Sequence, residues 1–348
     1  MIRPLPALNA SVRSASLLIV LTALLTVACR AAGTSTPAVG GTSTGAAPSA
    51  TAASASPAAS AEAFPVTLTD DEGTEVTIPA EPRAIVSLTP AETEILFALG
   101  AGDRVVGKVE DLANHPPEAE DVEIMGTFDG VDVEKVVGAD ADLVIAGGSG
   151  GTPEDAIDRI RALGVPVLVV YAATVEDVFE DVELTGAAVG RSAEAGELVA
   201  WMRDGFDDVA GATAAEPRPR VFYETGDQPA IYGIADDSVY AEMIELAGGD
   251  PITTGSTTSW EMPIEDLITA DPELIILGDS AYGVTPEAVA SRPGWDATTA
   301  VRNGAIEPID DIVVTRPGPR LVDGLRLLVA AIHPDVVLPS LAPRPAGG

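Results

Sequence analysis

The feature that most constrains the fold of this chain is a short motif that occurs twice. One copy, VDVEKVVGADADLVIAG, spans residues 131–147, and the other, PIEDLITADPELIILG, spans residues 263–278. Aligned at Val133 and Ile264, at an offset of 264 − 133 = 131 residues, the copies share a glutamate, an aspartate and several apolar positions. Each copy has the pattern of a helix start followed by an apolar strand. The repeat therefore predicts two similar lobes, each with its own sheet.

Both halves of the chain alternate short apolar runs with helical patterns. In the first half, the strand AIVSL is followed by a helix with Thr89 as N-cap, Pro90 at its first position and Glu92 completing a capping box. The second half repeats the alternation, from the strand PRVFYE to a closing helix that ends near His333. Strands that alternate with helices predict a parallel sheet covered by helices on both faces.

The segment that connects the two halves has the apolar spacing of a long helix. Residues 174–215 keep this spacing for roughly 30 residues, with an interruption at Gly190, Arg191 and Ser192. A single helix of that length could run along both lobes as a strut, and would allow only small lobe movement. Open α/β sheets bind ligands at the carboxyl ends of their strands. We therefore predict two doubly wound α/β lobes, joined by a long backbone helix, with the ligand cleft between them.

The N-terminus has the pattern of a secretory signal. Arg3 and Arg13 precede the apolar run SASLLIVLTALLTVA, and the small residue Ala28 stands directly before the single cysteine, Cys29. This predicts a signal peptide over residues 1–28 and a lipidated Cys29 that anchors the protein outside the cytoplasmic membrane. Thr26 occupies the position where such signals usually have leucine, so an ordinary signal peptide and an uncleaved anchor stay open as alternatives.

The rest of the chain divides by composition. Residues 31–61 contain only Ala, Gly, Ser, Thr, Pro and Val, and such a segment cannot bury enough apolar surface to order itself. The predicted division after the signal peptide is a lipidated cysteine and flexible tether over 29–63, a first lobe over 64–172, a connecting helix over 173–216, a second lobe over 217–338 and a disordered tail over 339–348.

Charge and residue counts exclude several functions. The formal net charge is −35, which repels nucleic acid and anionic lipid headgroups. One cysteine allows neither an intramolecular disulfide nor a multi-cysteine metal site, and two histidines cannot form a three-histidine metal site. We expect no nucleic-acid partner, no resident metal and no cofactor.

Four motifs, in their order and spacing, resemble a known family. They are PRAIVSLTPAETEILFALGAGDRVVG, HPPEAEDVEIMGTFDGVDVEKVVGADADLVIAG, WEMPIEDLITADPELIILG and RPGPRLVDG, which together cover about residues 75 to 335. The chain resembles the periplasmic binding proteins with a long backbone helix that serve ABC importers of ferric siderophores, haem and cobalamin. The resemblance implies a monomeric, non-enzymatic, membrane-tethered solute-binding protein. Its partners would be a permease dimer with a cytoplasmic ATPase, and Glu134 and Glu265, one on each lobe, would dock on the permease.

The ligand is expected at the ends of strands in both lobes. A ferric siderophore or cobalamin is the expected cargo, with haem third, and aromatic faces and an arginine suit such chelates. Direct coordination of a metal centre by His115 is an open alternative. In the first lobe, the loop from Leu112 to His115 is expected to contribute. The predicted ligand-binding residues are Thr89, Pro90, Leu112, His115, Phe128, Ser149, Tyr223, Trp260 and Arg316.

Two other functions are possible interpretations of the sequence, a serine hydrolase and a receptor without a transporter. The run from Gly147 to Gly151 fits the G-x-S-x-G pattern of a serine hydrolase, and Ser149, Asp279 and His333 have the chain order of its triad. However, Thr152 and Pro153 are typical of a helix start, whereas in a nucleophile elbow the helix begins directly after the serine. A surface receptor or sensor with the same fold but no transporter is the second alternative.

Overall fold

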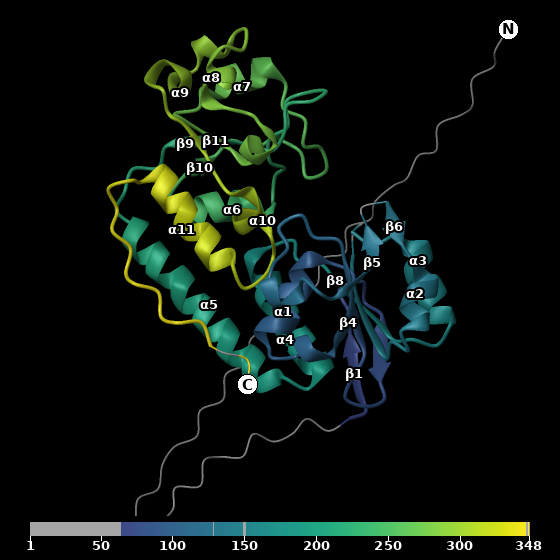
Figure 1. The fold of residues 1–348 in the computed structure, drawn as a ribbon. Helices are drawn as coiled ribbons and strands as arrows, with labels where there is room; N and C mark the ends of the chain where they lie inside the picture. The colour runs from purple at the N-terminus through teal and green to yellow at the C-terminus, as the bar shows by residue number, and fades with distance from the viewer. Residues whose placement is uncertain (1–63, 128, 149–150, 346, 348) are drawn as a thin grey trace, which may run out of the picture. The chain divides into compact units, whose positions relative to one another are not determined.

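The first lobe is built on a six-stranded sheet with the order β6-β5-β4-β3-β7-β8. The computed structural model describes residues 64–127, 129–148, 151–345 and 347, all within one compact unit (Figure 1). All neighbouring strands of this sheet are parallel except β5 and β6. A separate antiparallel hairpin, β1 and β2, precedes it. The strands are β1 (Val66–Thr69), β2 (Glu75–Ile78), β3 (Ile85–Ser87), β4 (Val105–Val109), β5 (Glu123–Thr127), β6 (Gly130–Val131), β7 (Leu143–Gly147) and β8 (Val167–Val170).

Helices cover both faces of this sheet, as the alternating pattern predicts. Successive residues of β7 point to opposite faces. Leu143 and Ile145 pack in the cluster that contains residues of α1 and α4, whereas Val144 packs with residues of α2 and α3. Figure 1 shows α2 and α3 on one side of the sheet and α1 and α4 on the other. The helices are α1 (Pro90–Ala98), α2 (Val133–Gly138), α3 (Glu154–Ala162) and α4 (Val175–Val189), with short 3-10 turns η1 (Gly102–Arg104) and η2 (Pro117–Ala119).

The second lobe has a smaller, fully parallel sheet with the order β10-β9-β11-β12. Helices α5, α6, α10 and α11 supply the core on one face, and α7, α8 and α9 cover the other (Figure 1). Its strands are β9 (Arg220–Glu224), β10 (Asp250–Pro251), β11 (Leu274–Leu277) and β12 (Ile306–Pro308). Its helices are α6 (Val239–Leu246), α7 (Ile264–Ala270), η3 (Gly278–Tyr282), α8 (Pro286–Ala290), η4 (Trp295–Ala297), α9 (Thr299–Asn303), α10 (Asp311–Thr315) and α11 (Leu321–Ile332).

The two copies of the repeat adopt the same local structure. In the first lobe α2 is followed by Asp140 in a left-handed conformation, with φ of 53°, and then by β7. In the second lobe α7 is followed by Asp271, with φ of 47°, and then by β11. Aspartate tolerates this conformation better than most residues, which explains why both copies have it there. The predicted internal duplication is confirmed at the level of backbone geometry.

The connecting segment differs from the single helix that we predicted. It consists of α4 and α5 (Ser192–Thr213), separated at Gly190, whose φ of 71° cannot continue a right-handed helix. The capping box of α4 is formed by Thr174 and Asp177. Helix α4 packs against α1 of the first lobe, and α5 packs both against α4 and against α6 and α11 of the second lobe (Figure 1). The segment is therefore two helices rather than one over residues 173–216, and the 22-residue α5 is the long backbone helix that packs against both lobes.

The C-terminal segment is also more ordered than its composition indicates. The indole Nε1 of Trp201 donates a hydrogen bond to the carbonyl of Ala342 at 2.8 Å. The guanidinium of Arg344 lies 5.1 Å from the Trp201 ring centroid and forms an ion pair with Asp323 at 3.3 Å. For the described residues 339–345, the prediction of a disordered tail is wrong because this segment packs along α5 and α11. None of the helices in the described part of the chain is long and apolar enough to cross a membrane.

Candidate ligand cleft

The first lobe opens to solvent where its strand order reverses. Strands β3 and β7 lie side by side, and their next connections lead to opposite halves of the sheet, which is the switch point where open α/β sheets bind ligands. Thr89 and Pro90 follow β3 there, and Gly147 and Gly148 end β7. A Cβ atom on Gly147 would lie 2.7 Å from Cγ2 of Thr89, so only glycine allows this close approach. A hollow of about 440 Å³ lies over this point.

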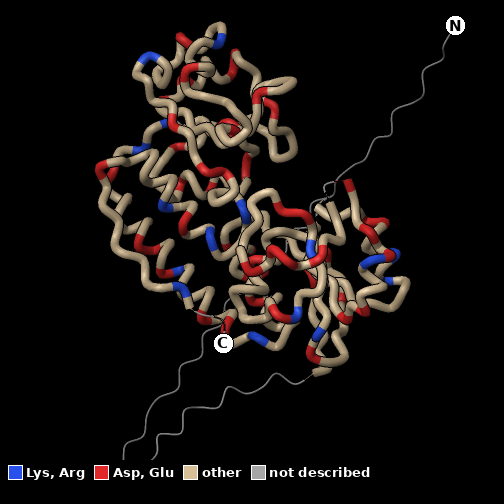
Figure 2. The backbone as a smooth tube through the Cα atoms, viewed as in Figure 1, with Lys and Arg blue, Asp and Glu red and all other residues tan. Residues whose placement is uncertain are grey.

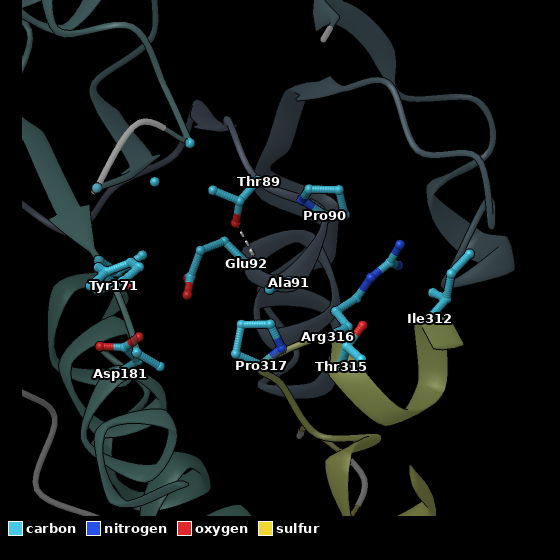
Figure 3. A pocket seen from close by; sticks show the side chains of 15 residues that line it. Thr89, Pro90, Ala91, Glu92, Tyr171, Asp181, Ile312, Thr315, Arg316 and Pro317 are labelled. Carbon is cyan, nitrogen blue, oxygen red and sulfur yellow. Dashed lines mark hydrogen bonds between the residues drawn. The ribbon is translucent and has the colours of Figure 1, made fainter. Parts of the chain in front are cut away.

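The opposite wall of this hollow comes from the second lobe. Across the hollow, the start of α1 faces Ile312 and Thr315 of α10, together with Arg316 and Pro317 (Figure 3). A second hollow of about 500 Å³ shares Tyr171, Ala172, Thr315 and Pro317 with the first and therefore continues it. The two hollows together form a cleft between the lobes, within the size range of small-molecule sites.

Aromatic rings line the second part of the cleft. Trp260 is 37% exposed, and its ring meets Tyr240 edge to face at a centroid distance of 5.3 Å. Tyr171 is 49% exposed and lines both parts. Such partly exposed rings can pack on a large flat ligand without first rearranging the core. Tyr240 is more deeply placed, and burial raises its pKa to about 12.

Arg316 joins the two lobes by ion pairs. It lies 2.7 Å from Oε1 of Glu94 on α1 and 2.7 Å from Oδ1 of Asp111 in the loop after β4. Arg320 adds a second bond of 2.7 Å to Glu94, and all four side chains are mostly buried. Although burial opposes ionisation, the hydrogen bonds from Arg316 and the backbone amide of His115 hold the pKa of Asp111 below its ordinary value. The cluster ties α1 to the segment that precedes α11.

Two buried carboxyl groups face the first part of the cleft. Glu92 on α1 and Asp181 on α4 are 2% and 5% exposed, and both line the hollow (Figure 3). The hydroxyl of Thr185 donates to Oε2 of Glu92 at 2.8 Å. Burial raises the pKa of Glu92 to about 8, against the effect of the Thr185 bond. Burial, followed by the contact with Asp71, raises the pKa of Asp181 to about 10.

The position of Glu92 corrects one local prediction. Thr89 is the N-cap of α1, as predicted, and its side chain accepts a hydrogen bond from the Glu92 amide at 3.1 Å. The Glu92 carboxyl group, however, does not complete a capping box, because it turns towards Thr185 on α4. Glu92 is thus part of the cleft rather than of the helix cap.

The structure brings together some of the predicted ligand-binding residues and separates others. Thr89, Pro90 and Arg316 line the first part of the cleft and Trp260 lines the second. Tyr223 does not reach it, because its ring is fully buried and its hydroxyl donates to Oδ1 of Asp311 at 2.8 Å.

The loop from Leu112 to His115 also lies outside the cleft. Leu112 is 66% exposed and lines neither part of it. His115 lines a separate hollow of about 270 Å³ beside Glu94 and Arg344. Phe128 and Ser149 lie outside the described residues, as does Cys29. The lining residues that were not predicted include Tyr171, Asp181, Thr315 and Pro317, together with Glu92 in this role.

The same switch point in the second lobe is closed by an ionic cluster. Strand order reverses between β9 and β11, and there Arg292 lies 2.6 Å from Oε2 of Glu224 and 2.9 Å from Asp227. The Arg292 guanidinium also lies 4.7 Å from the Trp295 ring centroid. Burial raises the pKa of Glu224 to about 7, against the effect of Arg292. The carboxyl group of nearby Asp279 is also buried and lies within hydrogen-bond contact of the Glu224 carboxyl group.

The geometry of Asp279 and His333 does not match a hydrolase triad. His333 is buried at the end of α11, and its Nε2 lies 3.1 Å from the carbonyl of Gly248. A catalytic base would instead be oriented by the carboxylate. Within the described ranges, no group of three or more His, Cys, Asp or Glu side chains is arranged to hold a metal ion.

Glu134 and Glu265 lie on the surface at equivalent places of the repeat. Each stands in the first turn of its helix, α2 or α7, before the core strand of its lobe. Glu134 is 80% exposed and pairs with Arg159 at 3.0 Å. Acidic residues are spread over both lobes, with few basic ones between them (Figure 2). Both glutamates are therefore displayed on the surface, one on each lobe.

The chain is similar to known binding proteins in both sequence and fold. The family model of periplasmic binding proteins matches residues 85–312. An uncharacterized ABC transporter substrate-binding lipoprotein of Bacillus subtilis is 35% identical over 276 residues, 78% of this chain and 86% of that protein. A cobalamin-binding protein of Halobacterium salinarum is 30% identical over 280 residues, 77% of this chain and 74% of that protein. The crystal structure of a periplasmic vitamin B12 binding protein of Vibrio cholerae has 24% identity and a TM-score of 0.64 over 73% of this chain and 98% of that one, which shows a shared fold.

Proposed function

The chain belongs to the periplasmic binding protein family, and from that premise we propose that it is the solute-binding component of an ABC importer. It captures a metal chelate outside the cytoplasmic membrane and delivers it to a permease whose ATPase lies in the cytoplasm. The observation that carries this proposal is the cleft itself. It lies over the switch point of one sheet, and the second lobe supplies its opposite wall.

The cargo is a corrinoid or a ferric siderophore, with haem third. The name of the Halobacterium relative supports a corrinoid. The two parts of the cleft have volumes of about 440 Å³ and about 500 Å³. A cleft of this size suits a large rigid chelate better than a single amino acid or ion. Trp260 and Tyr171 offer aromatic surface for its flat face. The chelate is transported and released, and the chain performs no chemistry on it.

Binding moves the two lobes little. One basis is the long backbone helix α5, which packs against both lobes. A shared apolar core supplies another, because Ile95 of α1 and Leu99 at its C-cap pack in one cluster with Leu321 and Leu325 of α11. The buried ion pairs of Arg316 and Arg320 with Glu94 cross the same boundary.

Glu134 and Glu265 dock on the two halves of the permease. Two exposed carboxylates on separate lobes give a two-point charge match to a two-fold partner and steer the encounter at long range. Neither glutamate is needed for packing, since each side chain points to solvent at a helix start. The protein acts as a monomer, held near the permease by lipidated Cys29 and the tether up to residue 63.

The docking test is ATPase stimulation of the permease reconstituted in vesicles. The double variant Glu134→Ala with Glu265→Ala is expected to lose most of the stimulation while its affinity for the chelate stays within about twofold of the wild type. Glu154→Ala with Glu287→Ala is the matched control, because these are also exposed first-turn glutamates, one on each lobe. Full stimulation by the docking variant would refute the docking role and favour a receptor that works without a transporter.

A further inference from the structure

The charges that surround the two docking glutamates are different. The repeat keeps the glutamate, but the residue after it is Lys135 in the first lobe and Asp266 in the second. These two residues are equivalent, because their offset of 266 − 135 = 131 residues is that of the glutamates. All four side chains are exposed. The sequence around Glu134 therefore carries both signs of charge, whereas that around Glu265 is acidic.

In the first lobe, ion pairs balance the charges around Glu134. The guanidinium of Arg159 on α3 donates to Oε1 of Glu134 at 3.0 Å. The ammonium group of Lys135 pairs with Glu123 on β5 at 3.3 Å. The Asp132 side chain caps α2 by accepting a hydrogen bond from the Lys135 amide at 3.0 Å. Each of these charged side chains therefore has a partner within the lobe, and the Glu134 carboxylate is shared with a cation.

In the second lobe, the docking glutamate has no such neighbours. Within the described part of the chain, neither Glu265 nor Asp266 forms an ion pair, although both are exposed in the first turn of α7. Two arginines approach this helix, but Arg220 and Arg302 both pair with Asp271 at its other end. The first turn of α7 therefore presents two negative charges, which attract a basic partner.

The second lobe has an arginine equivalent to Arg159, but that arginine has other partners. Helices α3 and α8 each follow the core strand of their lobe, and each starts within the sequence Thr-Pro-Glu, at residues 152–154 and 285–287. In both lobes an arginine stands five residues after this glutamate, at an offset of 292 − 159 = 133 residues. Arg292 turns into its lobe and pairs with the buried Glu224. The arginine that reaches the docking glutamate in the first lobe thus belongs to the sealed switch point in the second.

We propose, on the basis of the importer function above, that the two lobes dock unequally on the permease. The second lobe makes the stronger contact, and Arg159 is a positioning residue that weakens the first contact by competing for Glu134. A basic pocket that receives Glu134 must displace the Arg159 guanidinium and also brings its own positive charge close to it. At Glu265 no cation has to move, and Asp266 adds a second negative charge. An exposed ion pair of this kind changes an equilibrium constant by up to about fivefold.

Variants that remove one docking contact at a time measure this inequality. The partner is the permease whose ATPase the wild-type chain stimulates in the docking test above, held in nanodiscs of uncharged lipid. Surface plasmon resonance gives the Kd of each variant for this permease. Glu134→Gln with Arg159→Gln removes the ion pair as a unit and keeps the net charge of the chain. Glu265→Gln is expected to weaken docking at least about threefold more than that double variant does.

Substitution of Arg159 alone tests the competition. Arg159→Gln releases the Glu134 carboxylate, so docking is expected to become about two- to fivefold tighter. A purely structural role of Arg159 would not produce a gain in affinity. Arg159→Lys keeps the positive charge and should leave the Kd within about twofold of the wild type. Arg203→Gln is the matched control, because Arg203 forms an exposed ion pair with Glu176 apart from α2 and α3, and it should not change the Kd (Figure 1).

Three results would overturn the proposal while the importer function stands. The first is unchanged or weaker docking by Arg159→Gln, since weaker docking would mean that Arg159 bonds an acidic group of the permease. The second is a gain of the same size in Arg203→Gln, which would show a general effect of net charge. The third is a loss in Glu265→Gln no greater than the loss on removing the ion pair. If the wild-type chain stimulates no ABC permease, the proposed function itself is refuted, and this inference with it.

Discussion

The two lobes contain the same structural unit, but they use its switch point differently. In both, a left-handed aspartate precedes the core strand, and a glycine stands at the strand's carboxyl end: Gly147 is the last residue of β7, and Gly278 directly follows β11. The offset is 278 − 147 = 131 residues, the same as for the glutamates. Over Gly147 the first lobe is open and forms the cleft. Over Gly278 the second lobe is filled by Tyr223, Asp311 and the neighbouring ionic cluster.

This difference explains why the cleft is asymmetric. The first lobe supplies its strand ends, which is the usual ligand position in open α/β sheets. The second lobe supplies α10 and the loop with Trp260 instead, and its own strand ends are sealed by Arg292 and Glu224. The two copies thus share the sheet plan and the surface glutamates, whereas the cleft uses the strand ends of one copy only.

The sealed switch point should be the more important one for stability. Arg292→Met removes the partner of Glu224, whose carboxyl group is fully buried, and leaves Asp227 and Asp279 beside it. We expect the free energy of unfolding to fall by about 3–5 kcal/mol, since breaking a buried pair leaves an uncompensated charge. Urea denaturation at pH 8 measures this. Arg159→Met, which breaks the exposed pair with Glu134, should lower it by less than about 1 kcal/mol. Equal losses in the two variants would contradict the contrast.

The open switch point should instead lower the stability of the folded protein by an amount that depends on pH. Glu92 pairs with no cation among the residues that the structure describes, and burial raises its pKa from 4.5 to about 8. The folded protein therefore holds a proton that the unfolded chain releases between these values, so the wild type loses stability as the pH rises through this window. Glu92→Gln removes that loss of stability. At pH 8 we therefore expect the free energy of unfolding to be about 3 kcal/mol higher in the variant than in the wild type. The two proteins should differ little at pH 4.5. A difference that does not change with pH would show that Glu92 ionises normally.

Substitution of the equivalent glycines Gly147 and Gly278 should have the smallest effect on stability, and it compares the two switch points directly. A Cβ atom would lie 2.7 Å from Thr89 in Gly147→Ala and 2.6 Å from Tyr223 in Gly278→Ala. Each variant should lose about 1–3 kcal/mol of unfolding free energy, because neighbouring side chains must shift. Only Gly147→Ala should also weaken chelate binding, since Thr89 lines the cleft and Tyr223 does not. Calorimetric titration of both variants tests this, and weaker binding by Gly278→Ala alone would reverse our assignment of the open lobe.

The fold could be predicted from the sequence where local pattern and global structure agree. The repeat, the parallel sheets and the N-cap at Thr89 are all periodic or positional signals, and they are confirmed. The long backbone helix is confirmed as α5, but the connecting segment is two helices rather than one, because the apolar spacing continues on either side of the break at Gly190. The tail was not correct either, because its order depends on Trp201 and Arg344, which are far apart in sequence.

The site was predicted less well, for a related reason. Strand ends pointed to Thr89, Pro90 and Arg316, but they also pointed to Tyr223, whose side chain lies on the core face of β9. Arg316 was expected to meet ligand, and its ion pairs with Glu94 and Asp111 were not predicted, since these partners lie 222 and 205 residues away in the chain. Asp181 is on the connecting segment, where the pattern indicated only a helix.

The central claim is that one chelate is held between the open lobe and Trp260, and intrinsic fluorescence tests it most directly. Trp201 and Trp295 are buried, whereas Trp260 lines the cleft, so titration with cyanocobalamin, ferric siderophores and haem reports mainly on Trp260. We predict saturable quenching with one chelate per chain for at least one of these ligands, and loss of most of that quenching in Trp260→Phe. No quenching by any of the three, or quenching that is unchanged in Trp260→Phe, would contradict the account.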